Sequence, residues 1–213
     1  MANITIIGGT GFTGSHLAQE AAARGHRVIS LSRSEPAEPV DGVTYLTGSA
    51  DHPEQAVSGA DVIVATVSPR GDSAGTLGRR YGRLAELAAA SGARLVVVGG
   101  FSSLRPAPGA PRFAEGDDLP PEFADEAREL NAVLEDLIAN APEDLDWVFV
   151  SPAAAYGAYA PVAEPRGAYR VGDDVALFDA EGASFIGGED FARAVVDEIE
   201  TPTHRRSQIH FAY

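Results

Sequence analysis

Apolar runs alternate with amphipathic stretches along the first 150 residues of the 213-residue chain. Short apolar runs rich in β-branched residues are typical of strands, whereas apolar residues three and four positions apart are typical of helices. The predicted strands are 4–7, 27–31, 43–46, 61–65, 95–98 and 147–150, and the predicted helices are 13–24, 53–57, 77–88 and 130–138. This alternation predicts an α/β fold with a Rossmann-like, doubly wound parallel sheet.

The pattern loosens after residue 151. The predicted elements there are strands at 168–171 and 175–179, a helix at 190–199 and a last strand at 208–212. Because this tail is too short for a second domain, the sequence predicts a single domain over residues 1–213. Residues 151–213 are expected to form a small substrate-side extension over the crevice at the carboxyl edge of the sheet.

Residues 104–121 contain five prolines and several acidic residues, which predicts a long surface loop. The loop follows the carboxyl end of the strand at 95–98, and α/β sheets bind ligands at that edge. We therefore expect the loop to act as a flap beside the ligand site.

The chain has a formal net charge of −15 and contains neither cysteine nor lysine, so its 16 Lys and Arg residues are all arginines. An acidic chain is a poor match for nucleic acid or for an anionic membrane surface. The missing side chains exclude thiolate nucleophiles, Schiff bases and a P-loop lysine. The five histidines lack metal-ligand spacing, and no signal peptide or long apolar span is seen, which predicts a cytoplasmic protein without a metal.

A glycine-rich turn joins the first predicted strand to the first predicted helix. Glycine suits this turn because the backbone bends tightly, approaches a bound pyrophosphate and packs the helix against the strand. The pyrophosphate then faces the helix N-terminus, where free N–H groups and the helix dipole favour anions. In this strand–turn–helix context the motif predicts a dinucleotide site, formed by Gly8, Gly9, Thr10, Gly11, Phe12, Thr13 and Gly14.

The end of the second predicted strand bears on the choice between NADP and NAD. Many NAD sites place an acidic residue there to bind the adenosine ribose hydroxyls. This chain has Ser32 and Arg33 instead, with no acid before Glu35. An arginine can bind a ribose 2′-phosphate, with the serine as a second donor, so NADP is favoured over NAD. The alternative is that Arg33 is a solvated loop cation.

Three further strand ends carry groups suited to a ribose and a nicotinamide, at 65–70, 99–103 and 151–154. Ser102 and Ser103 in the second of these are weak candidates for a proton donor, and ordinary loop hydrogen bonding is the alternative.

Three tyrosines bear on the question of a catalytic residue. Tyr156 and Tyr159 follow the third of these strand ends, where they either cover a planar substrate or pack the tail. Tyr81 is interpreted as a core residue, because Ala85 stands where a Tyr-x-x-x-Lys pair requires lysine.

Five stretches, at 6–14, 25–33, 96–104, 145–153 and 189–192, resemble the atypical short-chain dehydrogenase/reductase family, in its group of NmrA-like and NADH-flavin reductase-like proteins. The plan is also similar to that of biliverdin reductase B. The resemblance implies that the glycine loop binds the pyrophosphate and that Arg33 meets the 2′-phosphate. It further implies that residues 66–68, 99–102 and 151–153 line the cofactor, including Thr66, Val67, Ser68, Gly99, Gly100, Pro152 and Ala153.

This chain departs from the family pattern at two places. Family members often carry an acidic residue soon after the third strand, beside the adenine, whereas here Asp51 is only a displaced candidate. Relatives often read Gly-Gly-Ala-Gly-Ser-Leu after the fifth strand, where this chain has a bulky Phe101. Such a residue is expected to change what fits over the nicotinamide.

The leading prediction is an NADPH-dependent oxidoreductase that passes a hydride to a small planar acceptor, such as a flavin or a quinone. A flavin accepts a hydride without a strong protein acid, so a site without a Tyr-Lys pair stays chemically viable. The alternative is a non-catalytic, NADP-sensing regulator of the NmrA type. A nucleotide-sugar epimerase or dehydratase is less expected, and the sequence leaves the oligomeric state open.

Overall fold

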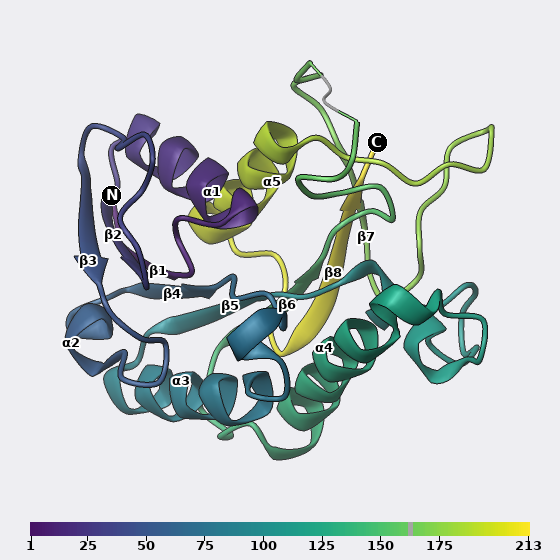
Figure 1. The fold of residues 1–213 in the computed structure, drawn as a ribbon, viewed down its shortest axis with the longest axis horizontal. Coiled ribbons are helices and arrows are strands. Elements are labelled where there is room, and N and C mark those ends of the chain that lie inside the picture. The colour runs from purple at the N-terminus through teal and green to yellow at the C-terminus, as the bar shows by residue number, and fades with distance from the viewer. Residues whose placement is uncertain (162–163) are drawn as a thin grey trace.

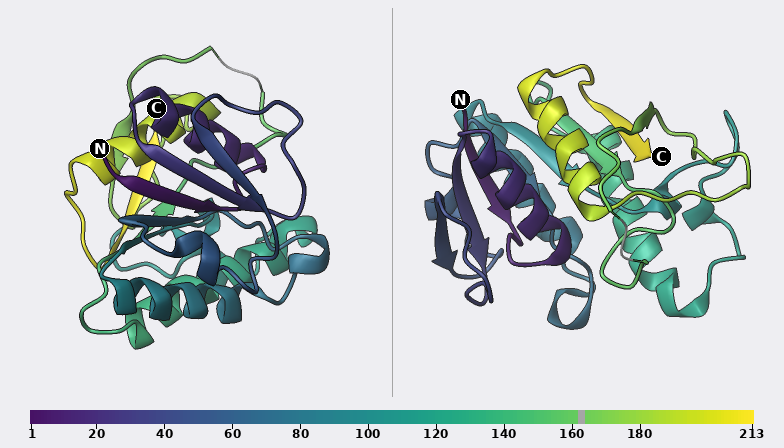
Figure 2. Two further views of the ribbon diagram at one scale, coloured as in Figure 1. Left: turned by 90° about the vertical axis from the view of Figure 1, so that its left-hand side faces the viewer. Right: turned by 90° about the horizontal axis from the view of Figure 1, so that it is seen from above.

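The computed structural model describes residues 1–161 and 164–213, and in this part of the chain eight strands form one mostly parallel sheet between two helical layers (Figures 1 and 2). The strand order is β3-β2-β1-β4-β5-β6-β8-β7, with β7 antiparallel to β8 and every other pair parallel. The strands are β1 (Asn3–Ile7), β2 (Arg27–Ser32), β3 (Val43–Thr47), β4 (Val62–Ala65), β5 (Arg94–Val98), β6 (Trp147–Ser151), β7 (Arg170–Gly172) and β8 (Ser207–Ala212).

Helices cover both faces of the sheet. One layer contains α1 (Phe12–Ala23) and α5 (Gly188–Glu200), and the other contains α2 (Glu54–Val57), α3 (Leu77–Ser91) and α4 (Pro121–Asn140) (Figure 1). β5 shows why the central strands read as continuous apolar runs. Val96 and Val98 pack in the α1–α5 core, whereas Leu95 and Val97 pack in the opposite core with α3 and α4.

The chain reverses its winding direction beside β1. It moves outward from β1 to β2 and β3, then returns to place β4 on the other side of β1 and continues to β5 and β6. At such a switch point the loops that leave neighbouring strands diverge and open a crevice at their carboxyl ends. This topology confirms the predicted doubly wound α/β fold and places the crevice above β1 and β4.

The tail contributes to the sheet itself as well as to its edge. β8 lies parallel to β6, and α5 packs beside α1, so both elements extend the main architecture. Residues 175–179 do not form the predicted strand, since only one bridge, between Arg105 and Val175, is made there. Ile138, predicted on the buried stripe of α4, is 52% exposed.

Residues 104–121 are anchored to the body of the protein. Leu104 and Arg112 are buried, and the backbone N–H of Phe113 donates to the carbonyl oxygen of Leu104 at 2.9 Å. The Arg112 guanidinium also donates to the side chains of Gln208 (2.6 Å) on β8 and Glu135 (3.0 Å) on α4. These bonds join the loop to two elements, while most of its residues are exposed and its one regular turn is a 3₁₀ turn at Phe113–Glu115.

Candidate functional site

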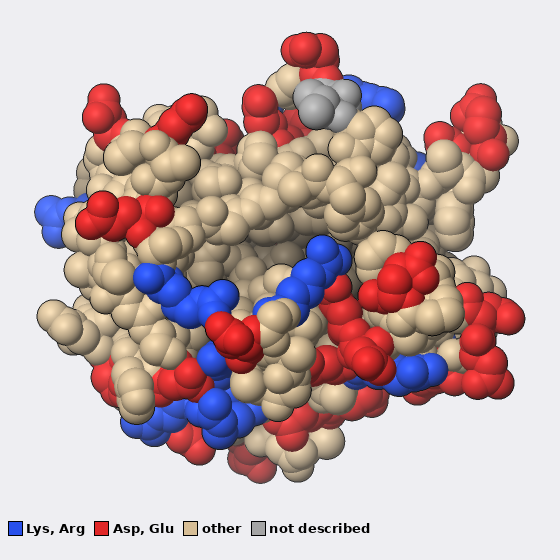
Figure 3. Space-filling view, viewed as in Figure 1, with Lys and Arg blue, Asp and Glu red and all other residues tan. Residues whose placement is uncertain are grey.

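A pocket of about 540 Å³ opens at the carboxyl ends of the central strands, and Figure 3 shows it as a hollow in the middle of the face. The predicted residues that line it are Gly8, Thr10, Gly11, Phe12, Thr13, Ser32, Arg33, Thr66, Val67, Ser68, Gly99, Gly100, Pro152, Ala153 and Tyr156. The predicted residues outside its lining are Gly9, Gly14, Asp51, Ser102 and Ser103. None of the described lining residues comes from 104–121, so the structure gives no support to a flap there.

The glycines of the first loop meet two different requirements. A Cβ on Gly14 would overlap the carbonyl oxygen of Gly8 and lie 2.6 Å from the Cα of Gly9, and a Cβ on Gly9 would overlap the side chain of Ser30. These two glycines are therefore needed for packing. A Cβ on Gly11 would approach only the carbonyl oxygen of Gly8, at 3.3 Å, and would otherwise point into the pocket.

The N-terminus of α1 faces the pocket. Gly11 is its first flanking residue, Thr10 to Thr13 line the cavity, and no side chain in the described part of the chain caps this end. The N–H groups of a first helical turn have no partners within the helix, and the helix dipole adds partial positive charge there. A pyrophosphate fits these donors, and Gly11 leaves room for it to approach.

Ser32 and Arg33 lie in the same lining, at the end of β2. The Ser32 hydroxyl accepts a hydrogen bond from the backbone N–H of Thr10 at 3.0 Å, so its own proton is available to donate to a ligand. Arg33 forms an ion pair with Asp72 at 3.2 Å, with side chains 64% and 94% exposed respectively. An ion pair this exposed is weak, which leaves the guanidinium available to a phosphate.

Asp51 does not line the pocket, although Ser49 and Ala50 before it do. Its carboxylate accepts two hydrogen bonds from Arg80, at 3.0 and 2.8 Å, and forms an ion pair with Arg79 at 2.6 Å. The Arg80 hydrogen bonds and then those of Arg79 hold the pKa of Asp51 well below its usual range. Arg80 itself is buried, lines the pocket and donates to the hydroxyl of Ser73 at 3.0 Å. The sequence does not single out Arg80, because α3 alone does not reveal its contact with Asp51.

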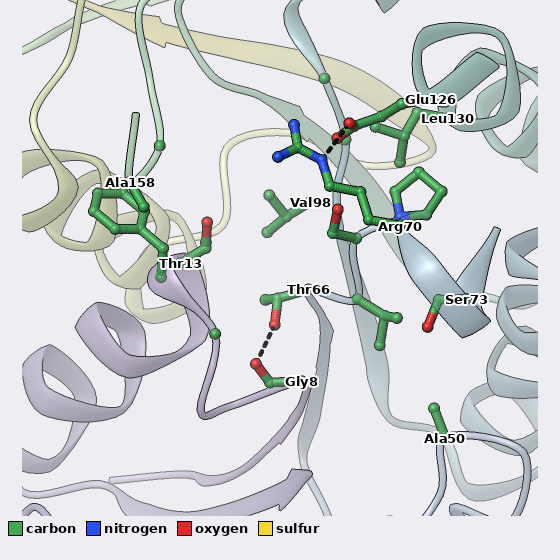
Figure 4. A pocket seen from close by; sticks show the side chains of 18 of the residues that line it. Gly8, Thr13, Ala50, Thr66, Arg70, Ser73, Val98, Glu126, Leu130 and Ala158 are labelled. Carbon is green, nitrogen blue, oxygen red and sulfur yellow. Dashed lines mark hydrogen bonds and ion pairs between the residues drawn. The ribbon is translucent and has the colours of Figure 1, made fainter. Parts of the chain in front are cut away.

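Thr66 joins the end of β4 to the glycine loop. Its hydroxyl is within hydrogen-bond distance of the carbonyl oxygens of Ile7 (3.0 Å) and Gly8 (3.1 Å), as the close-up shows for Gly8 (Figure 4). On the far side of this segment, the hydroxyl of buried Tyr81 donates to the carbonyl oxygen of Val67 at 2.9 Å. Burial raises the pKa of Tyr81. Tyr81 therefore supports the pocket from the core, in agreement with its sequence interpretation.

The end of β5 forms the next part of the wall. A Cβ on Gly99 would overlap the ring of Phe149, so glycine is required there by packing. Phe101 lines the pocket and stacks on Phe113, with ring centroids 5.1 Å apart. Ser103 is buried, and its carbonyl oxygen accepts a hydrogen bond from Gln208 at 3.1 Å. Neither Ser102 nor Ser103 lines the cavity.

Tyr156 lines the pocket from the loop after β6, but its hydroxyl is engaged. The hydroxyl lies 2.9 Å from that of Thr13, and the ring packs on Phe12 and Phe191 at centroid distances of 5.5 and 4.5 Å. Burial raises the pKa of Tyr156, and the Thr13 hydrogen bond offsets this only in part. Tyr156 therefore remains neutral and fixes the wall against the start of α1.

The mouth of the pocket carries exposed aromatic and charged groups. Tyr159 is 63% exposed and stacks on Phe123 of α4, with ring centroids 6.0 Å apart. Nearby, Nε of Arg70 donates to the Glu126 carboxylate at 2.6 Å (Figure 4). Within the described residues, no group of His, Asp and Glu side chains is arranged to hold a metal ion, and no helix is long and apolar enough to cross a bilayer.

A doubly wound sheet with a glycine turn and an open helix N-terminus at its switch point defines a Rossmann-type dinucleotide-binding protein. Residues 8–202 match the NAD(P)H-binding family, and the chain belongs to this family. The match bears out the resemblance drawn from the sequence motifs and the prediction of a nicotinamide cofactor.

Related proteins share the whole fold but carry different names. An uncharacterized Bacillus subtilis protein, YwnB, is 31% identical over 210 residues, which cover 96% of this chain and 95% of that protein. A Burkholderia pseudomallei structure named "putative exported protein" has a TM-score of 0.85 and 33% identity over 100% of both chains.

Two further structures cover 100% of this chain. A Bacteroides thetaiotaomicron "putative epimerase" has a TM-score of 0.85 and 29% identity, with 97% of that chain covered. A Streptococcus pneumoniae "putative NADH-flavin reductase" has a TM-score of 0.83 and 24% identity, with 99% of that chain covered. Because one fold carries such different names, the reaction must be argued from the site.

Proposed function

We propose that this protein is an NADPH-dependent oxidoreductase that reduces a small planar acceptor, with a flavin or quinone as the class of substrate. The observation that carries the proposal is the arrangement of one continuous pocket. The pocket follows the carboxyl edge of the sheet from Arg33 after β2, past the open N-terminus of α1, to the aromatic residues Phe101 after β5 and Tyr159 after β6. The α1 turn suits a dinucleotide pyrophosphate, and the aromatic region suits a flat ring.

NADPH is proposed over NADH because the cations of this acidic protein include three that line the pocket, Arg33, Arg70 and Arg80. Arg80 is held by Asp51 through two hydrogen bonds, whereas Arg33 has one exposed partner. Arg33 follows β2, the strand whose end approaches the adenosine ribose in this fold. It is therefore the residue proposed to bind the 2′-phosphate, with the Ser32 hydroxyl as a second donor.

When bound, NADPH supplies a hydride from the nicotinamide ring. The protein contributes position and exclusion of water, because Gly99, Gly100, Pro152 and Ala153 form a close wall at the end of the pocket proposed for the nicotinamide. Tyr156 keeps its proton at neutral pH, and its hydroxyl is hydrogen-bonded to that of Thr13. A flavin suits this site because solvent can provide the proton that completes its reduction.

Two other functions remain as alternatives. An NADP-sensing protein would use the same cofactor end without turnover. An epimerase is favoured by the names of relatives such as the Bacteroides structure, but a Tyr-Lys pair cannot form in a chain without lysine. We further propose that the protein acts in the cytoplasm on small molecules, without nucleic acid or membrane as a partner.

Steady-state oxidation of NADPH, followed by its absorbance, tests this proposal against a panel of flavins and quinones. We expect turnover above the uncatalysed rate with at least one acceptor, and little turnover with NADH. Tight NADPH binding without turnover of any acceptor would favour the sensor instead. The Gly11→Val variant serves as the matched control, since it should remove turnover by removing cofactor binding.

A further inference from the structure

Arg70 is a pocket cation that the proposed cofactor contacts leave unused. It follows β4, is 54% exposed and contacts Glu126 of α4 through Nε alone. Among the described residues, the two terminal nitrogens of its guanidinium have no hydrogen-bond partner. Figure 4 shows these nitrogens turned away from Glu126 and toward the open space above Val98. An arginine has five N–H donors, so a second ligand can bind without breaking the Glu126 contact.

The position of Arg70 places it toward the acceptor end. Glu126 and Leu130 of α4 and Val98 of β5 line the pocket around it, whereas Ser73 and Ala50 lie apart from its guanidinium in the close-up (Figure 4). Burial raises the pKa of Tyr159, and the charges of Arg70 and Glu126 also act on its hydroxyl, which is consistent with all three groups lying near one another.

Two aromatic rings extend this region. Phe123 lies one helical turn before Glu126 on α4, and its ring stacks on that of Tyr159. A cation with free donors thus lies near an exposed aromatic face at the mouth of the pocket. This combination matches a flat ring system that carries an anionic tail.

We infer that Arg70 binds the phosphate of a phosphorylated flavin, flavin mononucleotide (FMN), and makes the enzyme prefer FMN to riboflavin. The inference rests on the proposed function and names its acceptor class. Because the whole chain carries a net charge of −15, an anionic acceptor needs a local cation to bind. Arg33 is assigned to the cofactor, and all three guanidinium nitrogens of Arg80 donate to Asp51 or Ser73. The two terminal nitrogens of Arg70 have no such partner among the described residues, which leaves Arg70 for the acceptor.

The reaction balances as NADPH + FMN + H⁺ giving NADP⁺ and reduced FMN. A hydride moves from C4 of the nicotinamide to N5 of the flavin, and solvent supplies the proton. The cofactor is oxidised by two electrons and the flavin is reduced by two. Arg70 takes no part in these bond changes and acts as a specificity residue.

FMN and riboflavin provide the test, because they share one ring system and differ in the phosphate. We expect the Arg70→Gln variant to lower kcat/KM for FMN about tenfold, the loss of roughly one charge-assisted contact, and to change riboflavin less than twofold. Glu126→Gln should retain the preference for FMN. Arg128→Gln removes an exposed arginine of α4 outside the pocket and serves as the charge-matched control.

Equal loss for FMN and riboflavin would overturn the inference, and so would a rise in the KM for NADPH, which would make Arg70 a cofactor contact. Binding is measured separately by quenching of FMN and riboflavin fluorescence on the NADP⁺-saturated protein. Arg70-dependent FMN binding without turnover would refute the proposed function but keep the anion site. Failure of the unmutated protein to bind FMN more tightly than riboflavin would refute the anion site even if turnover occurs.

Discussion

The glycine-loop end of the pocket is made mainly of backbone, whereas the acceptor end is made of side chains from three separate segments. At the first end, Gly11 and the open turn of α1 offer N–H groups whose positions follow from the strand–turn–helix path. At the second end, Phe101, Arg70 and Tyr159 follow β5, β4 and β6 respectively. Where the backbone binds the ligand, the path of the chain restricts which residue types fit. Where side chains bind the ligand, the residue types can vary without changing the fold. The first end therefore identifies a cofactor class, and the second is the part proposed to select a substrate.

The largest effect is expected where backbone packs on backbone. Gly14→Val would force a side chain into the carbonyl of Gly8, and overpacking of this kind costs about 1–3 kcal/mol or more. For a chain of this size each kcal/mol lowers the Tm by about 2–4 °C, so the expected fall is about 2–12 °C. Thermal unfolding measured by circular dichroism checks it. An unchanged Tm would show that the loop adjusts and that its backbone is less constrained than described.

Gly11→Val separates binding from folding at the same end. Its Cβ meets only one neighbour, at 3.3 Å, so the Tm should stay close to that of the unmutated protein. The side chain should occupy the path of the pyrophosphate and weaken NADPH binding at least about 100-fold, the loss of one or two charge-assisted hydrogen bonds. A titration by NADPH fluorescence gives the affinity. If the folded variant kept its affinity for NADPH, the pyrophosphate would not bind at this turn.

Arg33→Ala tests a side-chain contact within the cofactor end. Because Arg33 is 64% exposed and solvent screens its charge, we expect only about tenfold weaker NADPH binding at low ionic strength and no change for NADH. Asp72→Asn is the matched control, since it removes the partner of Arg33 and should leave NADPH binding equal or slightly tighter. Equal weakening of both cofactors by Arg33→Ala would leave Arg33 without a role in choosing NADPH.

The smallest effect is expected from Tyr81→Phe, behind the pocket. Removing its hydrogen bond to Val67 should cost about 1 kcal/mol of stability and change kcat less than twofold. Because its pKa is raised above the usual value near 10, the neutral form stabilises the fold below pH 10, and this contribution is lost as the pH rises further. The pH profile of kcat from pH 6 to 10 should have the same shape in the unmutated protein and in Tyr81→Phe. A thousandfold fall in kcat with normal cofactor affinity would make Tyr81 catalytic.

The contrast between the two ends also explains what could be predicted from the sequence. The glycine loop was found because its residue types follow from local backbone geometry, and the strands were found because both faces of the sheet are apolar. The role of Arg80 was missed because it depends on Asp51, a residue brought close only by the folded chain. Ser103 shows a similar limit, since its position after β5 does not reveal that it is buried.

The tail shows the same limit. Residues 208–212 were predicted as a strand, but their pairing with β6 depends on the long path through α5. The sequence leaves the role of Tyr156 open, because its contact with Thr13 joins residues 143 positions apart. Local patterns therefore predict elements and backbone motifs, whereas side-chain roles require the tertiary contacts.

The central claim is that one pocket brings NADPH and a flavin together for hydride transfer. The most direct measurement mixes the protein with equal amounts of NADPH and FMN without oxygen and follows the absorbance of both. We predict that one FMN is reduced for each NADPH consumed, faster than without protein, and that Gly11→Val abolishes the acceleration. NADPH that binds tightly but stays reduced beside oxidised FMN would contradict the account.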